Sequence, residues 1–460
     1  MFAITGLIGS GKSFVSSVIR EAGFEVLDAD AFAHELYEKN AELRKKIAEE
    51  FGDEAITEKG INRSYISKLV FSEPKKLELL ESIVYPVLLN EIEKTDPVFV
   101  EAAVLYKCPE FAKKMKEIWM VEASEDLRKG RLLERGLEKI EIENRMLAQE
   151  AYNIKNAERI INNGTKEECK NRVLELLRKH IPNTIQRDVS LKKHTTFKIG
   201  GKAKFFAEAK DIDEIKALLA WRREFKIPYF VLGKGSNVLF KDEGYEGLII
   251  KLSKFDAANS LHSLIQNAAN HGFGGLEKLD GIPGSISGAI FMNAGAHGQQ
   301  ISDCVKSVTS IAESGEIITR TKEECEFSYR SSIFKNEIIL SAEFDFIPMP
   351  EEIINNNRKE VLAWRKAKQP LQYSNAGSIF KNPTPNSQLP TPNLSAGALI
   401  EACGLKGFSV GDAQVSELHA NFIVNKGNAT AKDVKTMMEK IVQKVKETHG
   451  VELEREIICF

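Results

Sequence analysis

An eight-residue phosphate-loop motif near the N-terminus, Gly6-Leu-Ile-Gly-Ser-Gly-Lys-Ser13, constrains the fold of this chain more than any other feature. In this G-x-x-x-x-G-K-[ST] pattern the backbone amides surround phosphates, the lysine reaches the terminal phosphates and the serine hydroxyl binds magnesium. The mechanism requires a strand before the loop and a helix after it, and the sequence offers both. A glycine turn without function is the alternative. The candidate nucleotide-binding residues are Gly6, Gly9, Gly11, Lys12 and Ser13, with Ser13 also the candidate Mg²⁺ ligand.

Apolar runs and helical patterns alternate through the first 180 or so residues. Runs typical of strands occur at 2–5, 24–29, 98–104, 118–121 and 159–161. Segments with helical spacing separate them, at 13–21, 75–94, 126–135 and 166–179. Strands separated by helices predict a parallel, doubly wound α/β sheet.

The pattern changes at the Pro-containing stretch His180-Ile-Pro-Asn-Thr. Glycine-rich turns and alternating strands follow, and after Pro350 a helix at 351–366 leads into a smaller α+β unit. Because 460 residues exceed one ordinary core, about three domains of roughly 100–200 residues are expected. We place them at 1–182, 183–350 and 351–460.

Composition argues against several classes of protein. A net charge of −2 gives no sign of a basic surface for nucleic acid or acidic membranes. The sequence has neither an apolar run long enough for a spanning helix nor a secretory leader pattern. The six scattered cysteines form no C-x-x-C pair, which argues against a zinc site or a disulfide framework. We therefore expect a cytoplasmic protein with small-molecule partners, and its oligomeric state stays open.

Charged residues suited to phosphoryl transfer accompany the phosphate loop. Asp30 follows the second predicted strand, where a carboxylate beside a bound triphosphate can accept a proton from an acceptor hydroxyl. A helix N-cap or a solvated turn is the alternative for this residue. Arg131, Arg135 and Arg145 fall on predicted helices, and mobile arginines can neutralise a transferring phosphate, although most surface arginines are only solvated.

The first part of the chain resembles dephospho-CoA kinase over nearly its whole length. The resemblance rests on the phosphate loop, Asp28-Ala-Asp30, Phe51-Gly52 with Gly60-Ile-Asn-Arg63, Val100-Glu-Ala-Ala-Val-Leu105, the arginine helices and Ile160-Ile-Asn-Asn-Gly164. It implies ATP-dependent phosphorylation of the ribose 3′-hydroxyl of dephospho-CoA. Asp30 is the implied base, and Arg63, Arg131 and Arg135 are implied substrate-binding residues. Three positions depart from the family pattern, because Leu7 replaces a glycine, Tyr85 a histidine and Gly136 an aspartate.

Four separated blocks mark the second part of the chain. In the first, the loop Gly233-Lys-Gly-Ser-Asn237 stands between a predicted strand and its continuation at 229–239, and its amides suit a pyrophosphate. A simple hairpin turn is the alternative. Glycine, serine and alanine residues of the block at 275–298 permit close backbone approach to a large flat ligand. Phe327-Ser-Tyr-Arg330 and Asn375-Ala-Gly-Ser378 are the last two blocks, and Glu454-Arg-Glu456 follows far downstream.

In this order, the motifs resemble UDP-N-acetylenolpyruvoylglucosamine reductase of bacterial cell-wall synthesis across nearly all of 183–460. The resemblance implies a FAD-binding domain of the vanillyl-alcohol-oxidase/PCMH type, followed by a small α+β substrate-binding domain. The short link between Arg330 and Ser378 resembles the type II branch, which lacks a substrate-covering tyrosine insertion. The implied FAD-binding residues are Gly233, Gly235, Ser236, Asn237, Gly284, Ser285, Gly288, Asn293 and Gly295.

The implied reaction is reduction of FAD by NADPH and then hydride transfer to the β-carbon of an enolpyruvyl ether. Negative charge grows at the carboxylate and the α-carbon, so a fixed cation with a hydrogen-bond donor lowers the barrier. Arg330 fits that role with a protonated Glu456 as partner, and Ser378 would supply the proton. A structural ion pair and a turn hydroxyl are the alternatives. The implied substrate-binding residues are Tyr329, Lys381 and Asn382.

One departure concerns the segment between Lys254 and Ser260, which is shorter than in the family, where it helps to wall the flavin. The leading hypothesis is a bifunctional enzyme that uses FAD, NADPH, ATP and Mg²⁺. A second hypothesis makes the kinase part a regulatory or scaffold module without turnover, which Tyr85 and Gly136 favour. A third makes the flavin part a binding module that lost its chemistry through the short segment.

Overall fold

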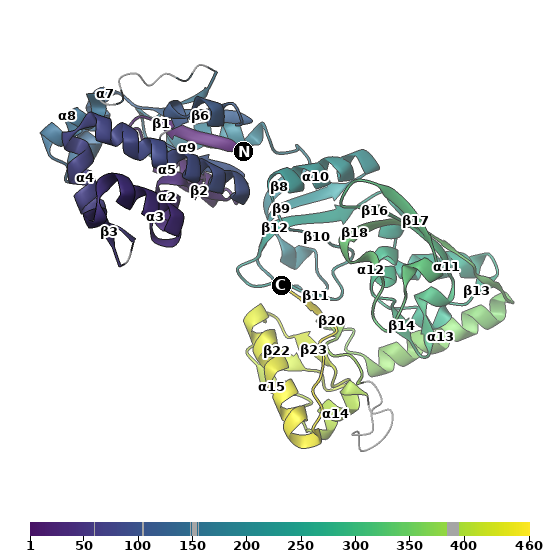
Figure 1. The fold of residues 1–460 in the computed structure, drawn as a ribbon. Helices are drawn as coiled ribbons and strands as arrows, with labels where there is room; N and C mark the ends of the chain where they lie inside the picture. Colours follow the sequence, from purple (N-terminus) through teal and green to yellow (C-terminus); the bar gives the residue numbers. More distant parts are fainter. Residues whose placement is uncertain (59, 104, 148, 150–153, 155, 384–394) are drawn as a thin grey trace. The chain divides into compact units, whose positions relative to one another are not determined.

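The computed structural model describes residues 1–58, 60–103, 105–147, 149, 154, 156–383 and 395–460 (Figure 1). It divides into two compact units. The first comprises Met1–Ile181 with Glu224–Lys226, and the second comprises Pro182–Arg223 with Ile227–Phe460. None of the described helices is long and apolar enough to cross a membrane.

Five parallel strands in the order β2-β5-β1-β6-β7 form the sheet of the first unit. They are β1 (Phe2–Gly6), β2 (Val26–Asp28), β5 (Phe99–Glu101), β6 (Glu117–Glu122) and β7 (Glu158–Ile161). All five fall within one or two residues of the predicted starts, and the predicted parallel α/β architecture is confirmed. The central strand β1 is buried along its whole length, as expected of a strand covered on both faces.

Helices separate these strands, and a small hairpin of β3 (Ile56–Thr57) and β4 (Gly60–Ile61) lies among them. The helices are α1 (Lys12–Glu21), α2 (Ala29–Lys39), α3 (Ala41–Phe51), α4 (Arg63–Ser72), α5 (Pro74–Thr95), α6 (Pro109–Ala112), α7 (Glu125–Glu134), α8 (Lys139–Leu147) and α9 (Lys166–Arg178).

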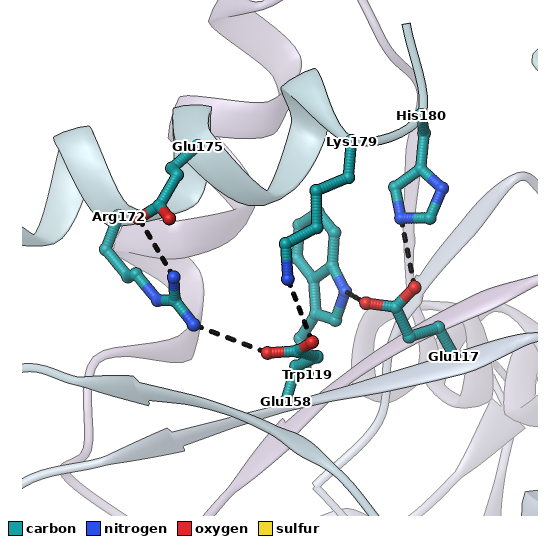
Figure 2. Close-up of polar contacts among 7 residues, drawn as sticks. All are labelled: Glu117, Trp119, Glu158, Arg172, Glu175, Lys179 and His180. Carbon is teal, nitrogen blue, oxygen red and sulfur yellow. Dashed lines mark hydrogen bonds and ion pairs between the residues drawn. The ribbon is translucent and has the colours of Figure 1, made fainter.

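Polar contacts connect α9 and the residues after it to β6 and β7 (Figure 2). Glu158 of β7 lies 3.3 Å from Arg172 and 2.9 Å from Lys179. Glu117 of β6 accepts a 2.8 Å hydrogen bond from the indole of Trp119, and its other oxygen lies 3.0 Å from His180 Nε2. The last helix of the first unit is therefore held at the edge where the parallel sheet ends.

Two sheets build the first part of the second unit. One has the order β10-β12-β9-β8 and the other the order β17-β16-β18. Their strands are β8 (Ile185–Ser190), β9 (Lys202–Ala209), β10 (Tyr229–Val231), β12 (Tyr245–Leu252), β16 (Val305–Ala312), β17 (Ile317–Thr321) and β18 (Glu337–Phe344). The accompanying helices are α10 (Ile212–Glu224), α11 (Leu261–Asn270) and α12 (Ile286–Phe291), and the short pairs are β13 (Phe273–Gly274) with β19 (Ile347–Pro348) and β14 (Gly295–Ala296) with β15 (Gln299–Gln300).

Helix α13 (Glu351–Lys368) leads into the last part of the chain and runs two residues beyond its predicted end. There, four strands in the order β20-β23-β22-β21 pack against α14 (Ala396–Ala402) and α15 (Ala431–His449). The strands are β20 (Ser374–Ser378), β21 (Ser409–Val410), β22 (Ala413–Val415) and β23 (Phe422–Asn425). The apolar stripe of α15, with Val434, Met438, Ile441 and Val445, is buried in this core.

The expected strand at 229–239 and its continuation lie in two different sheets. Strand β10 pairs with β12, whereas β11 (Val238–Leu239) pairs in parallel with the C-terminal strand β24 (Ile458–Cys459). The chain leaves the first sheet because Gly235 adopts a φ of +65° and passes against the backbone of His194, where a Cβ would lie 2.2 Å from the carbonyl oxygen. Pairing with β24 brings the end of the chain to this loop.

Candidate active sites

A cavity of about 740 Å³ lies in the second unit. Twelve of the residues singled out in the sequence line it, and they come from five separate segments: Gly233, Gly235, Ser236, Asn237, Gly284, Ser285, Gly288, Gly295, Arg330, Ser378, Asn382 and Glu456. The volume is in the range typical of cofactor and small-ligand sites. The fold therefore gathers sequence-distant motifs around one cavity.

Two glycine-containing loops form part of the cavity wall. Gly233 faces Ser285 so closely that a Cβ on Gly233 would lie 2.4 Å from the Ser285 hydroxyl. The same hydroxyl accepts a 3.2 Å hydrogen bond from the backbone amide of Gly288 and so caps α12. The missing side chain at Gly233 thus lets the two loops pack against each other where they line the cavity.

The side chains of Arg330 and Glu456 are hydrogen-bonded at this cavity. Arg330 Nε donates to Glu456 Oε1 at 2.7 Å, and one terminal nitrogen of Arg330 donates to the Gly295 carbonyl at 3.1 Å. Burial raises the pKa of Glu456 despite the opposing influence of Arg330 and Lys381. Arg330 also adopts a φ of +58°. This left-handed conformation costs roughly 1–2 kcal/mol for a residue with a Cβ, a type of strain that clusters at functional sites.

Ser378 reaches the same cavity from the end of β20, where the pairing with β23 is irregular. Gly377 supplies a φ of +74°, and the Asn375 side chain accepts a 3.0 Å hydrogen bond from its amide. This local turn shifts the strand register by one position and turns Ser378 toward the ligand space.

The remaining residues predicted for the second unit do not line the cavity. Asn293 does not line the cavity: it is 1% exposed and donates to Gln300 Oε1 at 2.9 Å and to the Ser328 carbonyl at 3.0 Å. Because Ser328 lies two residues before Arg330, this hydrogen bond from Asn293 supports the segment that carries Arg330. Tyr329 is half exposed, and its hydroxyl accepts a 3.2 Å hydrogen bond from the Asn382 amide.

Lys381 is paired at the surface, with its Nζ 3.3 Å from Glu454 Oε2. Sequence reasoning missed His297, Trp364 and Arg365, which also line the cavity. The last two lie on α13, whose pattern in the sequence is that of an ordinary surface helix. Nothing in their local sequence indicates that the helix borders the ligand space.

In the first unit, the phosphate loop connects β1 to α1 with Gly9 and Gly11 in the left-handed region, at φ of +78° and +99°. Lys12 Nζ donates to the carbonyls of Gly6 and Leu7 at 3.0 and 3.3 Å. Burial lowers the pKa of Lys12, although Glu101 and Asp30 act in the opposite direction. Ser13 donates its hydroxyl hydrogen to Glu101 Oε1 at 3.1 Å.

Asp28 and Asp30 have different environments. Asp28 Oδ1 accepts hydrogen bonds from the amides of Asp30 and Ala31 at 3.0 Å each, so Asp28 is the N-cap of α2. Burial and the neighbouring Asp28 raise the pKa of Asp30, while the opposite charge of Lys12 lowers it. The capping alternative considered for Asp30 therefore applies to its neighbour.

Among the predicted arginines, Arg131 lies directly against the loop. It donates to the carbonyls of Gly9 and Ser10 at 3.3 and 3.1 Å and to the Asn162 carbonyl at 3.0 Å. Arg135 follows α7, and its positive charge is one of the influences that lower the pKa of Lys12. Arg63 is the first residue of α4. Burial raises the pKa of Tyr37, the positive charge of Arg63 lowers it, and the negative charge of Asp30 raises it.

Three further residues contact the phosphate loop or its serine and were not selected from the sequence. They are Glu101, Gln149, whose Oε1 accepts from the Ile8 amide at 2.7 Å, and Asn162, which donates to the Ser10 carbonyl at 2.8 Å. Glu101 ends β5, the strand beside β1, and a carboxylate at that position is a signal that could have identified it. Glu101 and Asn162 also lie in the motifs Val100–Leu105 and Ile160–Gly164, although neither was given a role there, and Gln149 follows no recognisable spacing.

Three family models match different parts of the chain. Residues 369–460 match the model of the UDP-N-acetylenolpyruvoylglucosamine reductase C-terminal domain, residues 203–321 that of a FAD binding domain, and residues 1–168 that of dephospho-CoA kinase.

Individual proteins extend the similarity. UDP-N-acetylenolpyruvoylglucosamine reductase of Agathobacter rectalis is 40% identical over 298 residues, which are 59% of this chain and 92% of that protein. The reductase of Caldanaerobacter subterraneus is 42% identical over 281 residues, covering 58% and 90%. The crystal structure of UDP-N-acetylenolpyruvylglucosamine reductase from Thermus caldophilus aligns with a TM-score of 0.52 and 36% identity, over 60% of this chain and 98% of that one.

Proposed function

The chain belongs to the UDP-N-acetylenolpyruvoylglucosamine reductase family and carries a dephospho-CoA kinase domain before it, and from this premise we propose that it is a bifunctional enzyme. The second unit reduces UDP-N-acetylenolpyruvoylglucosamine to UDP-N-acetylmuramate with electrons from NADPH. The first unit phosphorylates the 3′-hydroxyl of dephospho-CoA with ATP. The observation that carries the reductase proposal is the meeting of Arg330, Glu456 and Ser378 at one cavity.

The cavity suits FAD because two glycine loops expose their backbone and leave no room for a Cβ at Gly233 or Gly235. Gly233, Gly235, Ser236 and Asn237 on one loop, and Gly284 and Ser285 on the other, would hold the cofactor. When bound, FAD would accept hydride from NADPH and return it to the β-carbon of the enolpyruvyl substrate.

The protein side chains act on the other end of the double bond. Arg330 is held by Glu456 and by the Gly295 carbonyl, so its positive charge is fixed where the substrate carboxylate gains electron density. Neutral Glu456, favoured by burial, can donate a hydrogen bond to the same region. Ser378 supplies the proton to the α-carbon. The proposal assigns substrate binding to Asn382, Tyr329 and Lys381.

For the kinase, the proposal assigns the phosphates to the amides of the loop and to Lys12. Ser13 and Glu101 lie 3.1 Å apart and offer oxygen atoms of the kind that Mg²⁺ prefers. Asp30, with a raised pKa, would accept the proton of the ribose hydroxyl, since a base of higher pKa binds the transferred proton better. Arg63, Arg131 and Arg135 supply positive charge for the acceptor and the transferring phosphate.

Two assays on the purified full chain test this proposal. The absorption spectrum should show bound flavin that NADPH bleaches and that UDP-N-acetylenolpyruvoylglucosamine restores. Separately, ATP should be consumed in proportion to dephospho-CoA added. A flavin that NADPH reduces but the enolpyruvyl substrate leaves reduced would contradict the reductase assignment.

A second candidate function makes the first unit a nucleotide-binding regulatory module. The observation in its favour is Tyr85, which replaces the family histidine and donates to Glu81 Oε1 at 3.0 Å. ATP binding without phosphate transfer to dephospho-CoA would support this module over the kinase.

A further inference from the structure

Three charged or titratable side chains cluster beside the reductase cavity, around the buried carboxylate of Asp280. The carboxylate of Asp280 is 0% exposed. It accepts hydrogen bonds from His262 Nδ1 at 2.5 Å, from Arg358 Nε at 2.7 Å and from the Gly281 amide at 2.9 Å. His262 belongs to α11 and Arg358 to α13, so one carboxylate joins two helices to the start of the following loop.

That loop is part of the cavity wall. Ile282, Pro283, Gly284 and Ser285 line the cavity, whereas the three clustered side chains do not. Gly281, between the cluster and the lining residues, has a φ of +80°, and a Cβ there would lie 2.9 Å from Arg365 Cδ and from Leu362 Cδ2 of α13. Helix α13 therefore packs against the first residue of the loop while Arg358 fixes the carboxylate before it.

The opposite side of the loop is held by residues 259–261, which precede and begin α11. Leu261 N donates to the Gly284 carbonyl at 3.1 Å, and Ile286 N donates to the Asn259 carbonyl at 2.9 Å. Ser260 and Ser285 form an antiparallel bridge between these bonds. His262 comes directly after Leu261, so residues 259–261 and the Asp280 cluster are connected through the chain.

We propose that Asp280, with His262 and Arg358, is a positioning cluster that holds the 281–285 loop in the conformation that binds FAD. The inference rests on the proposed function, in which FAD occupies the cavity.

The charge of the cluster gives the proposal a specific signature. Removing one partner of a buried ion pair leaves an uncompensated charge, whereas replacing both partners is often nearly neutral. Asp280→Asn keeps the size of the side chain and an acceptor for the Gly281 amide, but leaves Arg358 buried without its counter-charge. Asp280→Asn combined with Arg358→Met removes both charges.

The test is equilibrium titration of the apoprotein of the full chain with FAD, followed by flavin fluorescence. Asp280→Asn should weaken FAD binding about tenfold, which corresponds to ~1.4 kcal/mol. The double variant should recover part of that loss, because the charge of the buried Arg365 also interacts with Asp280 and stays uncompensated. Ile354→Val is the matched control, because Ile354 is 0% exposed on the same helix and makes no ion pair. It should lower the thermal stability of the apoprotein without changing the affinity for FAD.

Unchanged FAD affinity in Asp280→Asn, or an equal loss of affinity in Ile354→Val, would overturn the inference. If Asp280→Asn does not fold, His262→Leu carries the test, because the His262 side chain is 48% exposed. Weaker FAD binding by His262→Leu supports the cluster, and unchanged binding overturns it. A wild-type chain that takes up no FAD would instead overturn the proposed function, and this inference with it.

Discussion

The guanidinium of Arg330 and the carboxylate of Glu456 lie 2.7 Å apart although 126 residues separate them in the chain. Their meeting depends on the C-terminal strand β24, which pairs with β11 beside the glycine loop. Asn237 of that loop adds a 3.2 Å hydrogen bond from its side chain to the Glu456 carbonyl. One short strand thus joins the expected cofactor loop to the expected catalytic pair.

The raised pKa of Glu456 predicts a pH dependence of substrate reduction. In the proposed mechanism the protonated carboxyl is the hydrogen-bond donor, so reoxidation of reduced enzyme by the enolpyruvyl substrate should slow as the pH rises through that raised pKa. Glu456→Gln is neutral at every pH and should lose this dependence. Stopped-flow absorbance at a series of pH values measures it, and an unchanged profile in Glu456→Gln would assign the ionisation to another group.

The raised pKa of Glu456 also makes the stability of the folded protein depend on pH. A carboxyl whose pKa is higher in the folded than in the unfolded state binds its proton more tightly when folded. Its stabilisation is therefore complete below the ordinary glutamate pKa of 4.5 and is lost as the pH rises through the raised value. Chemical denaturation of wild type and Glu456→Gln should show the variant gaining relative stability over that interval.

Replacing Ser378 with alanine should separate the two half-reactions of the reductase. Reduction of the flavin by NADPH needs no proton from Ser378, so rapid bleaching should persist in Ser378→Ala. Reoxidation by the enolpyruvyl substrate should slow by about 10²–10⁴, the usual contribution of general-acid catalysis. Stopped-flow traces of each half-reaction provide the measurement. Equal slowing of both steps would mean that Ser378 only maintains the shape of the site.

Lys12→Ala should abolish phosphorylation of dephospho-CoA and leave NADPH oxidation unchanged. Lys12 lies in the phosphate loop of the first unit, and none of the residues lining the reductase cavity comes from that loop. Loss of a fixed cation that stabilises transferring charge should reduce the kinase rate at least about 100-fold. Parallel assays of both activities on one preparation test this, and a wild-type kinase rate in Lys12→Ala would exclude the assigned site.

Gly233→Ala should weaken FAD binding because its Cβ would meet the Ser285 hydroxyl at 2.4 Å. Ser285→Ala removes that oxygen and leaves the nearest Ser285 atom at 3.5 Å, so the double variant should recover part of the affinity. Ser285→Ala alone should cost about 0.5–2 kcal/mol of stability through the lost cap of α12. FAD titration and thermal unfolding of the three variants measure both effects. A double variant weaker than Gly233→Ala would show that the clash lies elsewhere.

Local patterns were sufficient for the five parallel strands of the first unit and for α1, α5, α7 and α9. The five strands and the phosphate loop follow from apolar runs, helical spacing and glycine positions, since each depends on a few neighbouring residues. The same reasoning singled out the loop at 233–237, where a Cβ at Gly233 or Gly235 would meet another atom at 2.4 or 2.2 Å. At Gly284 of the second loop, by contrast, a Cβ would meet no atom closer than 3.6 Å.

Those local patterns could not predict which strands and side chains pair when they lie far apart in the sequence. The sequence suggested one continued strand at 229–239, but β11 pairs with a strand from the end of the chain. Asn293 was predicted to bind the cofactor; it does not line the cavity but is buried and hydrogen-bonded to Ser328, because the direction of a side chain depends on how its helix or turn packs. The buried pairing of Asp280 with Arg358, 78 residues away, has no local signal either.

The sequence by itself determined which chemical groups this protein has and which short structures present them. Glycine loops, a lysine, carboxylates and a serine carry that information in their own stereochemistry. Only the tertiary structure decided which of these groups meet, as Arg330 meets Glu456 and His262 meets Asp280. The physical reason is that such contacts depend on strand register and helix packing, which are fixed by the burial of the whole core rather than by any one segment.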